Sequence, residues 1–142
     1  MGTYQNILVA IDLNEEADKV VRKACQMGLQ TGAKLTLIHV TEPLSYAYGG
    51  DIPMDLSSIQ KQLHEHAEQR MSNFVQQHKL DDVDQLLVSG HIETEVHRVA
   101  NELSSDLIVV GSHGRHGLAL LLGSTSNGIL HGATCDVLAV RI

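Results

Sequence analysis

The hydrophobic positions of the chain follow two alternating patterns. Short, continuous apolar runs rich in β-branched residues are typical of strands buried on both faces of a sheet. Between these runs, apolar residues recur three and four positions apart, which is the pattern of a helix with one buried face. The runs that we expect to form strands are 6–12, 34–40, 84–90, 105–111 and 135–142.

The segments between the strands predict helices with defined buried faces. In the first, Asn14 is placed to cap the N-terminus and Gly32 to end the helix. Its apolar face comprises Ala17, Val20, Val21, Ala24, Cys25, Gly28 and Leu29. The next and longer helix carries Ile59, Leu63, Ala67, Met71, Phe74 and Val75 on one face. From these patterns we expect Val21, Cys25, Leu29, Val99 and Leu103 to be buried.

The regular alternation of strands and helices predicts the fold class. Short buried strands separated by helices are typical of an α/β protein with a parallel sheet covered on both faces. Right-handed crossovers and one reversal of winding direction give a doubly wound, Rossmann-like sheet of five strands. No repeat or linker divides the chain, so we expect a single domain over residues 1–142.

Composition and charge narrow the class of protein. The chain has 142 residues, 17 of them Asp or Glu and 10 Lys or Arg, with a formal net charge of −7. This balance argues against a broad surface for nucleic acid or anionic membranes. The first residues lack the basic start of a signal peptide, and no apolar run approaches the ~18 residues of a membrane span. We therefore expect a soluble, cytoplasmic protein.

The stretch VVGSHGRHGLALLLGST, residues 109–125, is the strongest candidate for a functional segment. It holds four glycines between a strand and a helix, where backbone N–H groups and a helix N-terminus can receive phosphate. The stretch is not a Walker loop, and it lacks one glycine of the dinucleotide fingerprint. From the spacing alone, two interpretations stay open: a nucleotide-binding loop, or glycines needed only for packing and turns.

Other candidate chemistry is weaker. The segment HEHAEQR, residues 64–70, has Glu68 where a zinc-binding HExxH motif needs histidine, so we expect no metal site. His113 and His116 have no recognisable carboxylate or nucleophile partner, and we predict no catalytic residue. Cys25 and Cys135 lack metal-type spacing and are expected to be buried thiols.

Five segments together resemble the universal stress protein (UspA) family over essentially the whole chain. They are NILVAID, GAKLTLIHV, DLIVVGSHGRHGL, LLLGST and CDVLAVRI. The resemblance implies the strand order 3-2-1-4-5 and a homodimer formed through the last strand, residues 137–142. Independently, an apolar strand at the edge of a sheet favours pairing with a second copy of itself. The family has one branch that binds ATP and one that does not.

The ATP-binding branch carries the motif Gly-x2-Gly-x9-Gly-Ser/Thr. Here Gly111 and Gly114 match its first half and Gly123 with Ser124 its second half, but eight residues separate them instead of nine. Within a helix, one residue fewer rotates the remaining turns by about 100°. The resemblance implies a site in which Asp12 meets the adenosine, Val40 and Val110 line the base, and the ribose and phosphates meet Gly111, His113, Gly114, Gly123, Ser124 and Thr125.

Two functions from different classes are therefore expected. The first is a dimeric, non-enzymatic stress-response regulator with a pocket for ATP or AMP, with magnesium bound only together with the nucleotide. The alternative is a nucleotide-free dimeric module that binds an unknown protein partner.

Overall fold

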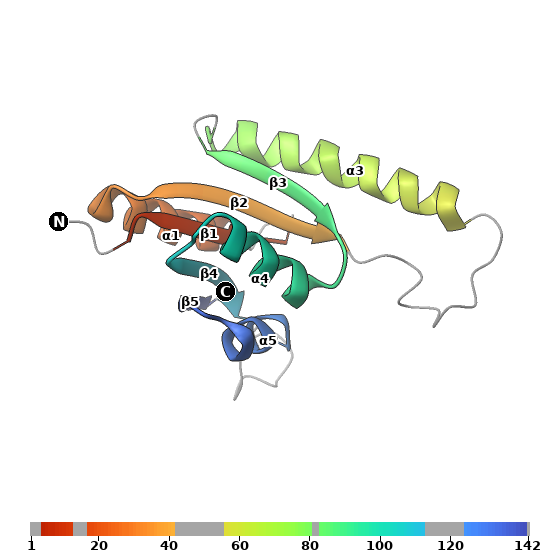
Figure 1. The fold of residues 1–142 in the computed structure, drawn as a ribbon. Helices are drawn as coiled ribbons and strands as arrows, with labels where there is room; N and C mark the ends of the chain where they lie inside the picture. Colours follow the sequence, from red (N-terminus) through yellow and green to blue (C-terminus); the bar gives the residue numbers. More distant parts are fainter. Residues whose placement is uncertain (1–3, 13–16, 42–55, 81–82, 113–123, 142) are drawn as a thin grey trace.

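A computed structural model describes residues 4–12, 17–41, 56–80, 83–112 and 124–141. Along the chain, strands and helices alternate, and the helix between β2 and β3 carries the label α3 (Figure 1). The elements are β1 (Asn6–Ala10), α1 (Ala17–Thr31), β2 (Lys34–Thr41), α3 (Leu56–Gln77), β3 (Asp84–Ser89), α4 (Ile92–Glu102), β4 (Leu107–Ser112), α5 (Ser124–Gly132) and β5 (Asp136–Arg141). The predicted strands are confirmed, with ends that agree within about two residues.

The five strands form one parallel sheet in the order β3-β2-β1-β4-β5. The central strand is β1, and its Val9 lies between Leu37 of β2 and Val109 of β4 in register. The predicted fold class, a doubly wound α/β sheet with this strand order, is confirmed. The strand order reverses direction between β1 and β4, and ligands of doubly wound sheets bind beyond the carboxyl ends of the strands at such a point.

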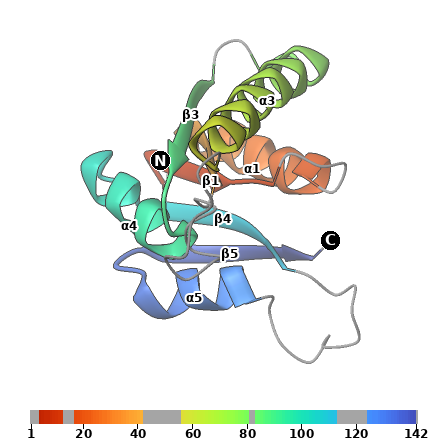
Figure 2. The same ribbon diagram turned by 90° about the vertical axis from the view of Figure 1, so that its right-hand side faces the viewer.

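Two helices cover each face of the sheet (Figure 2). Side chains of α1 and α3 pack on Ile7, Val9 and Leu37, whereas side chains of α4 and α5 pack on Leu8 and Ile38. The alternation along β1 follows from the two-residue period of a strand, which directs successive side chains to opposite faces. Both faces are apolar, which explains why the strands read as continuous hydrophobic runs.

The end of α1 is formed as predicted. Gly32 has a φ of 71°, and its N–H donates to the carbonyl of Gly28 at 2.7 Å. A positive φ at the residue after a helix is a common ending, and glycine adopts it without steric cost. The predicted cap at Asn14 lies outside the described residues, as do the leucines that precede α5.

Three of the burial predictions need correction. Val21 and Val99 are buried, but Leu29 is 87% exposed, Leu103 is 38% exposed, and Cys25 is half-buried. The buried face of α1 is narrower than the apolar pattern. Cys25 already lies at its edge, and Leu29, one turn later, lies beyond it, while the neighbouring Gly28 is buried.

The apolar face of α3 is buried over its C-terminal half only. Ala67, Met71, Phe74 and Val75 belong to the core, whereas Ile59 and Leu63 are 46% and 50% exposed. Figure 1 shows the reason, because the first turns of α3 extend beyond the end of β3. In the part of the chain that the structure describes, no helix combines the length and hydropathy needed to cross a membrane.

These differences predict unequal effects for two leucine substitutions. Leu8→Ala removes a side chain of zero exposure from the central strand and should lower the free energy of unfolding by about 2–5 kcal/mol. Leu29→Ala, the matched control, should change it by less than about 0.5 kcal/mol. Urea unfolding of both variants measures the difference, and similar losses would contradict this description of the core.

Candidate functional site

A small cavity lies at the carboxyl ends of the central strands. Its volume is about 40 Å³. The residues that line it come from β1, β2 and β4 and from the two helices on one face; they are Ala10, Ile11, Asp12, Ile38, Val40, Ile92, Val96, Val110, Gly111 and Ile129. The cavity therefore occupies the position where this fold class binds its ligands.

The end of β1 is held in place by β2. The N–H of Ile11 donates to the carbonyl of Ile38 at 3.0 Å, and the carbonyl of Ile11 lies 2.7 Å from Nδ1 of His39. Because a carbonyl can only accept, the ring donates from Nδ1. The backbone that precedes Asp12 is therefore fixed by two bonds. Sequence reasoning missed His39, although a polar residue within an apolar strand is a usable signal.

The walls of the cavity are apolar and belong to the core. Val110 and Val96 are buried, and Ile129 of α5 is fully buried against β4 and α4. Polar groups occur at the rim, where the strands end: Asp12 is exposed, and Gly111 offers backbone without a side chain. An apolar slot with a few polar groups at its mouth is the usual make-up of a small-molecule site.

The structure brings together four of the nine predicted site residues. Asp12, Val40, Val110 and Gly111 line the same cavity. His113, Gly114 and Gly123 lie outside the described residues. Ser124 and Thr125 form the first turn of α5, but the positions of their side chains also lie outside the description. The predicted contacts with a ligand remain predictions.

The cavity enclosed by the described walls is small for a site that binds a small molecule. A volume of about 40 Å³ suits water molecules, which need about 10–15 Å³ each by this measure. Pockets for small molecules usually measure about 300–1,000 Å³. A nucleoside would therefore need space beyond the described walls or movement of them.

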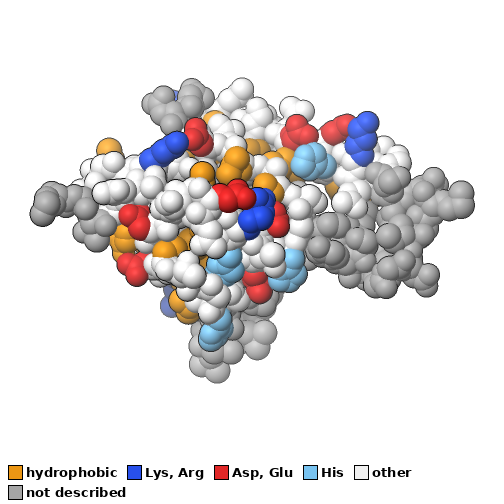
Figure 3. Space-filling model, viewed as in Figure 1, with side chains coloured by type: hydrophobic (Ala, Val, Ile, Leu, Met, Phe, Trp, Pro, Cys, Tyr) orange, Lys and Arg blue, Asp and Glu red, His pale blue; other side chains and the backbone are white. Residues whose placement is uncertain are grey.

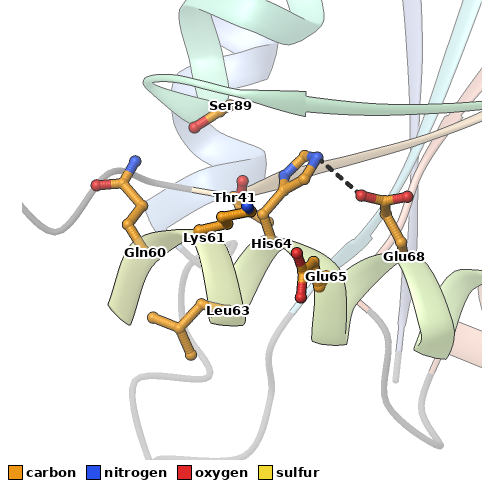
Figure 4. Close-up of a pocket in the computed structure, with 8 residues that line it drawn as sticks. All are labelled: Thr41, Gln60, Lys61, Leu63, His64, Glu65, Glu68 and Ser89. Atoms are coloured by element: carbon orange, nitrogen blue, oxygen red, sulfur yellow. Dashed lines mark ion pairs between the residues drawn. The ribbon is translucent and has the colours of Figure 1, made fainter. Parts of the chain in front are cut away.

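A larger hollow of about 600 Å³ lies between α3 and the ends of β2 and β3 (Figure 4). Thr41 and Ser89 border it on the strand side, and Lys61, His64 and Glu68 on the helix side. Nε2 of His64 lies 3.4 Å from a carboxylate oxygen of Glu68, one turn later. Their side chains are 41% and 60% exposed. A pair so open to water stabilises little, and we regard this hollow as a solvated groove.

Metal binding and thiol chemistry find no support in the described residues. Within those residues, no group of three or more His, Cys, Asp or Glu side chains could hold a metal ion. Burial raises the pKa of the Cys25 thiol and, together with nearby Asp136, that of Cys135. Both thiols are half-buried rather than fully buried as predicted. With raised pKa values they stay protonated and unreactive at neutral pH.

Charged side chains are mixed on the surface. On the face shown in Figure 3, acidic and basic side chains lie interspersed, without a basic patch among the described residues. Several of them pair locally, for example Arg98 with Glu95 at 2.8 Å and with Glu102 at 2.9 Å. The Arg98–Glu102 pair is exposed and contributes little to stability, whereas the Glu95 side chain of the other pair is only 18% exposed.

Fold and cavity together define a doubly wound α/β protein with its candidate site where the strand order reverses. The model of the universal stress protein family matches residues 3–141. Universal stress protein A homolog 2 of Coxiella burnetii is 43% identical over 100% of this chain and 98% of its own length. Universal stress protein A homolog 1 of the same organism is 38% identical over 96% of each chain. The chain belongs to the universal stress protein family.

Solved structures agree with the fold. Universal stress protein UspA from Lactobacillus plantarum superposes with a TM-score of 0.80, covering 99% of this chain and 100% of its own, at 23% identity. A universal stress protein solved in complex with cAMP superposes with a TM-score of 0.63, covering 97% of each chain, at 23% identity.

The contact of His39 with Ile11 leads to a prediction about the end of β1. His39→Ala should lower the free energy of unfolding by about 0.5–1.5 kcal/mol, the usual contribution of one hydrogen bond. It should also speed hydrogen exchange at the Ile11 amide. His131→Ala, at an exposed histidine in the last turn of α5, is the control and should change neither quantity. Unchanged Ile11 exchange in His39→Ala would show that this bond does not hold the strand end.

Proposed function

We propose that this protein is a cytoplasmic, dimeric stress-response regulator that binds an adenine nucleotide at the carboxyl ends of β1 and β4. The observation that carries the proposal is the meeting of Asp12, Val40, Val110 and Gly111 around one cavity. These residues come from three strands that are distant in sequence, and they are the ones that the family resemblance assigns to adenosine and ribose. The solved relative in complex with cAMP supports an adenine nucleotide as the ligand.

Each group has a distinct task in this proposal. The branched side chains of Val40 and Val110 pack against the base, and the carboxylate of Asp12 accepts hydrogen bonds from the nucleoside. The phosphates lie toward the N-terminus of α5, whose N–H groups and dipole favour anions. There Gly111, Gly114 and Gly123 allow close approach, and His113, Ser124 and Thr125 supply donors. Magnesium accompanies the nucleotide when it binds.

The regulator holds the nucleotide and does not turn it over. The sequence places no lysine clamp and no activated nucleophile beside the glycines. The bound nucleotide then acts as a signal, because a ligand that binds only the folded state stabilises it and whatever surface it presents to partners.

A second function is favoured by a specific observation, the small volume of the cavity. Its described walls enclose only about 40 Å³, too little for an adenine by themselves, and the glycine motif is one residue short. A protein of the nucleotide-free branch would act through its dimer and an unknown protein partner. Calorimetry separates the two functions, once the purified protein has been checked for bound nucleotide.

Titration with ATP and AMP should give heat of binding in wild-type protein. Asp12→Asn should weaken the affinity about 10- to 100-fold, because it replaces a charged acceptor with a neutral one. Asp84→Asn is the control; it removes an exposed carboxylate at the start of β3 that pairs with Lys34. Absence of both heat and thermal shift with wild-type protein at about millimolar nucleotide, well above ordinary dissociation constants, would favour the nucleotide-free function.

We propose that β5 forms the dimer interface. β5 is an edge strand of the sheet. Its apolar side chains are only half-buried; they are Val137, Leu138, Ala139 and Val140. Pairing with the β5 of a second copy around a two-fold axis would extend the sheet and cover these residues.

A charged substitution on β5 tests this interface. Ala139→Glu places two like charges close together across a two-fold axis and should convert the dimer to monomer. Leu29→Glu, at the exposed leucine of α1, adds the same charge elsewhere and should leave the dimer intact. Light scattering coupled to gel filtration gives the mass, and circular dichroism confirms folding. A folded, dimeric Ala139→Glu protein would exclude β5 as the interface.

A further inference from the structure

Side chains of the protein itself close the cavity at the strand ends. Val40 and Val110, which are proposed to hold the base, are only 8% and 3% exposed. The helices contribute three of the side chains that line the same cavity: Ile92 and Val96 from α4 and Ile129 from α5. A volume of about 40 Å³ has room for only a few water molecules, so these side chains face the valines across a short gap. A base that lies against the two valines would need room that the helix side chains now occupy.

Ile92 differs in burial from the other two helix side chains. Val96 and Ile129 have zero exposure and belong to the core on this face of the sheet. Ile92 is half-buried and packs against the same cluster from outside. A smaller side chain at Ile92 therefore widens the cavity at little cost to the core, whereas a smaller one at Val96 or Ile129 leaves a hole within it.

The start of α4 sets the position of Ile92 beside the strand ends. Ile92 is the first residue of this helix, and Gly90, two residues earlier, donates its N–H to the carbonyl of Thr41 at 3.0 Å. This bond holds the turn against the end of β2, the strand that carries Val40. In the described part of the chain, the side chain of His91, the capping residue, makes no hydrogen bond to the helix end. The first turn of α4 thus lacks the side-chain cap that commonly fixes such a turn.

We propose that Ile92 determines how readily this site accepts a base: its side chain fills the space facing Val40 and Val110, and it moves aside when an adenine ring enters. The inference rests on the proposed nucleotide site and names the residue that limits its affinity. Displacing a half-buried apolar side chain costs free energy, and that cost is subtracted from the affinity of the ligand. Because Ile92 acts on the base, its effect should be equal for adenosine, AMP and ATP.

Ile92→Ala tests the proposal because it empties the space that the base requires. Calorimetry should show an affinity gain of about 3- to 10-fold over wild-type protein, equal for adenosine, AMP and ATP, which is the order expected from part of the burial of one isoleucine. Ile92→Val, which removes one methyl group, should give a smaller gain. Ile92→Phe fills the space with a larger side chain and should weaken all three affinities. A general loosening of the helix would not produce effects of opposite sign.

Ile59→Ala is the matched control. It shortens an isoleucine that is 46% exposed on another helix, α3, and it should leave the three affinities unchanged. Circular dichroism confirms that each variant is folded. The methyl resonances of Val40 and Val110 show whether the ligand occupies this cavity, because an aromatic ring shifts the signals of methyl groups that lie against it.

The outcomes distinguish this inference from the site on which it rests. Binding by wild-type protein without a gain in Ile92→Ala, a gain confined to ATP, or a gain without shifts of the two valine signals would overturn the role of Ile92 and leave nucleotide binding in place. Binding by Ile92→Ala alone would support that role. Absence of binding by both proteins, at about millimolar ligand, would overturn the nucleotide site and the inference together.

Discussion

The burial of β1 between two parallel neighbours is the constraint on which the rest of the structure depends. Ile7, Leu8 and Val9 are at most 1% exposed, so both faces and both edges of this strand are covered. At its start, the carboxylate of Asp106 accepts from the N–H groups of Gln5 and Asn6 at 2.8 and 3.0 Å. At its end, β2 holds the backbone of Ile11. Because neighbouring segments hold β1 at both ends, the chain leaves the sheet toward Asp12 from a fixed point.

The two faces of the sheet are closed in different ways. On one face, Nε2 of His78, the residue that follows α3, lies 2.5 Å from a carboxylate oxygen of Asp18 in α1. The ring of His78 also packs on that of Phe74, with centroids 4.2 Å apart. On the other face, side chains of α4 approach the backbone of α5 at Gly128 and Gly132, and Ile129 of α5 packs in one cluster with Val96 of α4. The second arrangement lies on the face where the cavity opens.

The strands could be predicted because the central ones are buried on both faces, which leaves unbroken apolar runs in the sequence. Their order followed from the resemblance to the family and not from the runs. The length over which each helix is buried against the sheet could not be predicted. The periodicity of α1 includes Leu29, yet whether the last turn still faces the sheet depends on where the helix ends relative to β2. Similarly, Ile59 and Leu63 continue an apolar face that runs past the end of β3. Periodicity shows which side of a helix is apolar, but not how much of its length the sheet covers.

The candidate site shows the same division between local pattern and spatial arrangement. Asp12 and Gly111 could be found in the sequence because they end apolar runs, where a parallel sheet exposes its carboxyl edge. His39 interrupts an apolar run and could have been noticed, but its contact with the carbonyl of Ile11 depends on the neighbouring strand and could not be predicted. The size of the cavity likewise depends on packing between Ile129, Val96 and Val110, which no local pattern records.

Substitutions in the walls of the cavity and at its rim differ in their effect on the stability of the fold. Most of the walls are core residues, and removal of buried apolar groups such as Val110 or Ile129 costs stability whether or not a ligand binds. Selection for a particular ligand can therefore change these walls only at the expense of the fold. At the rim, Asp12 is exposed and contributes little to the core. If the proposed site binds a nucleotide, a change of charge at Asp12 would alter its affinity while the core stays intact.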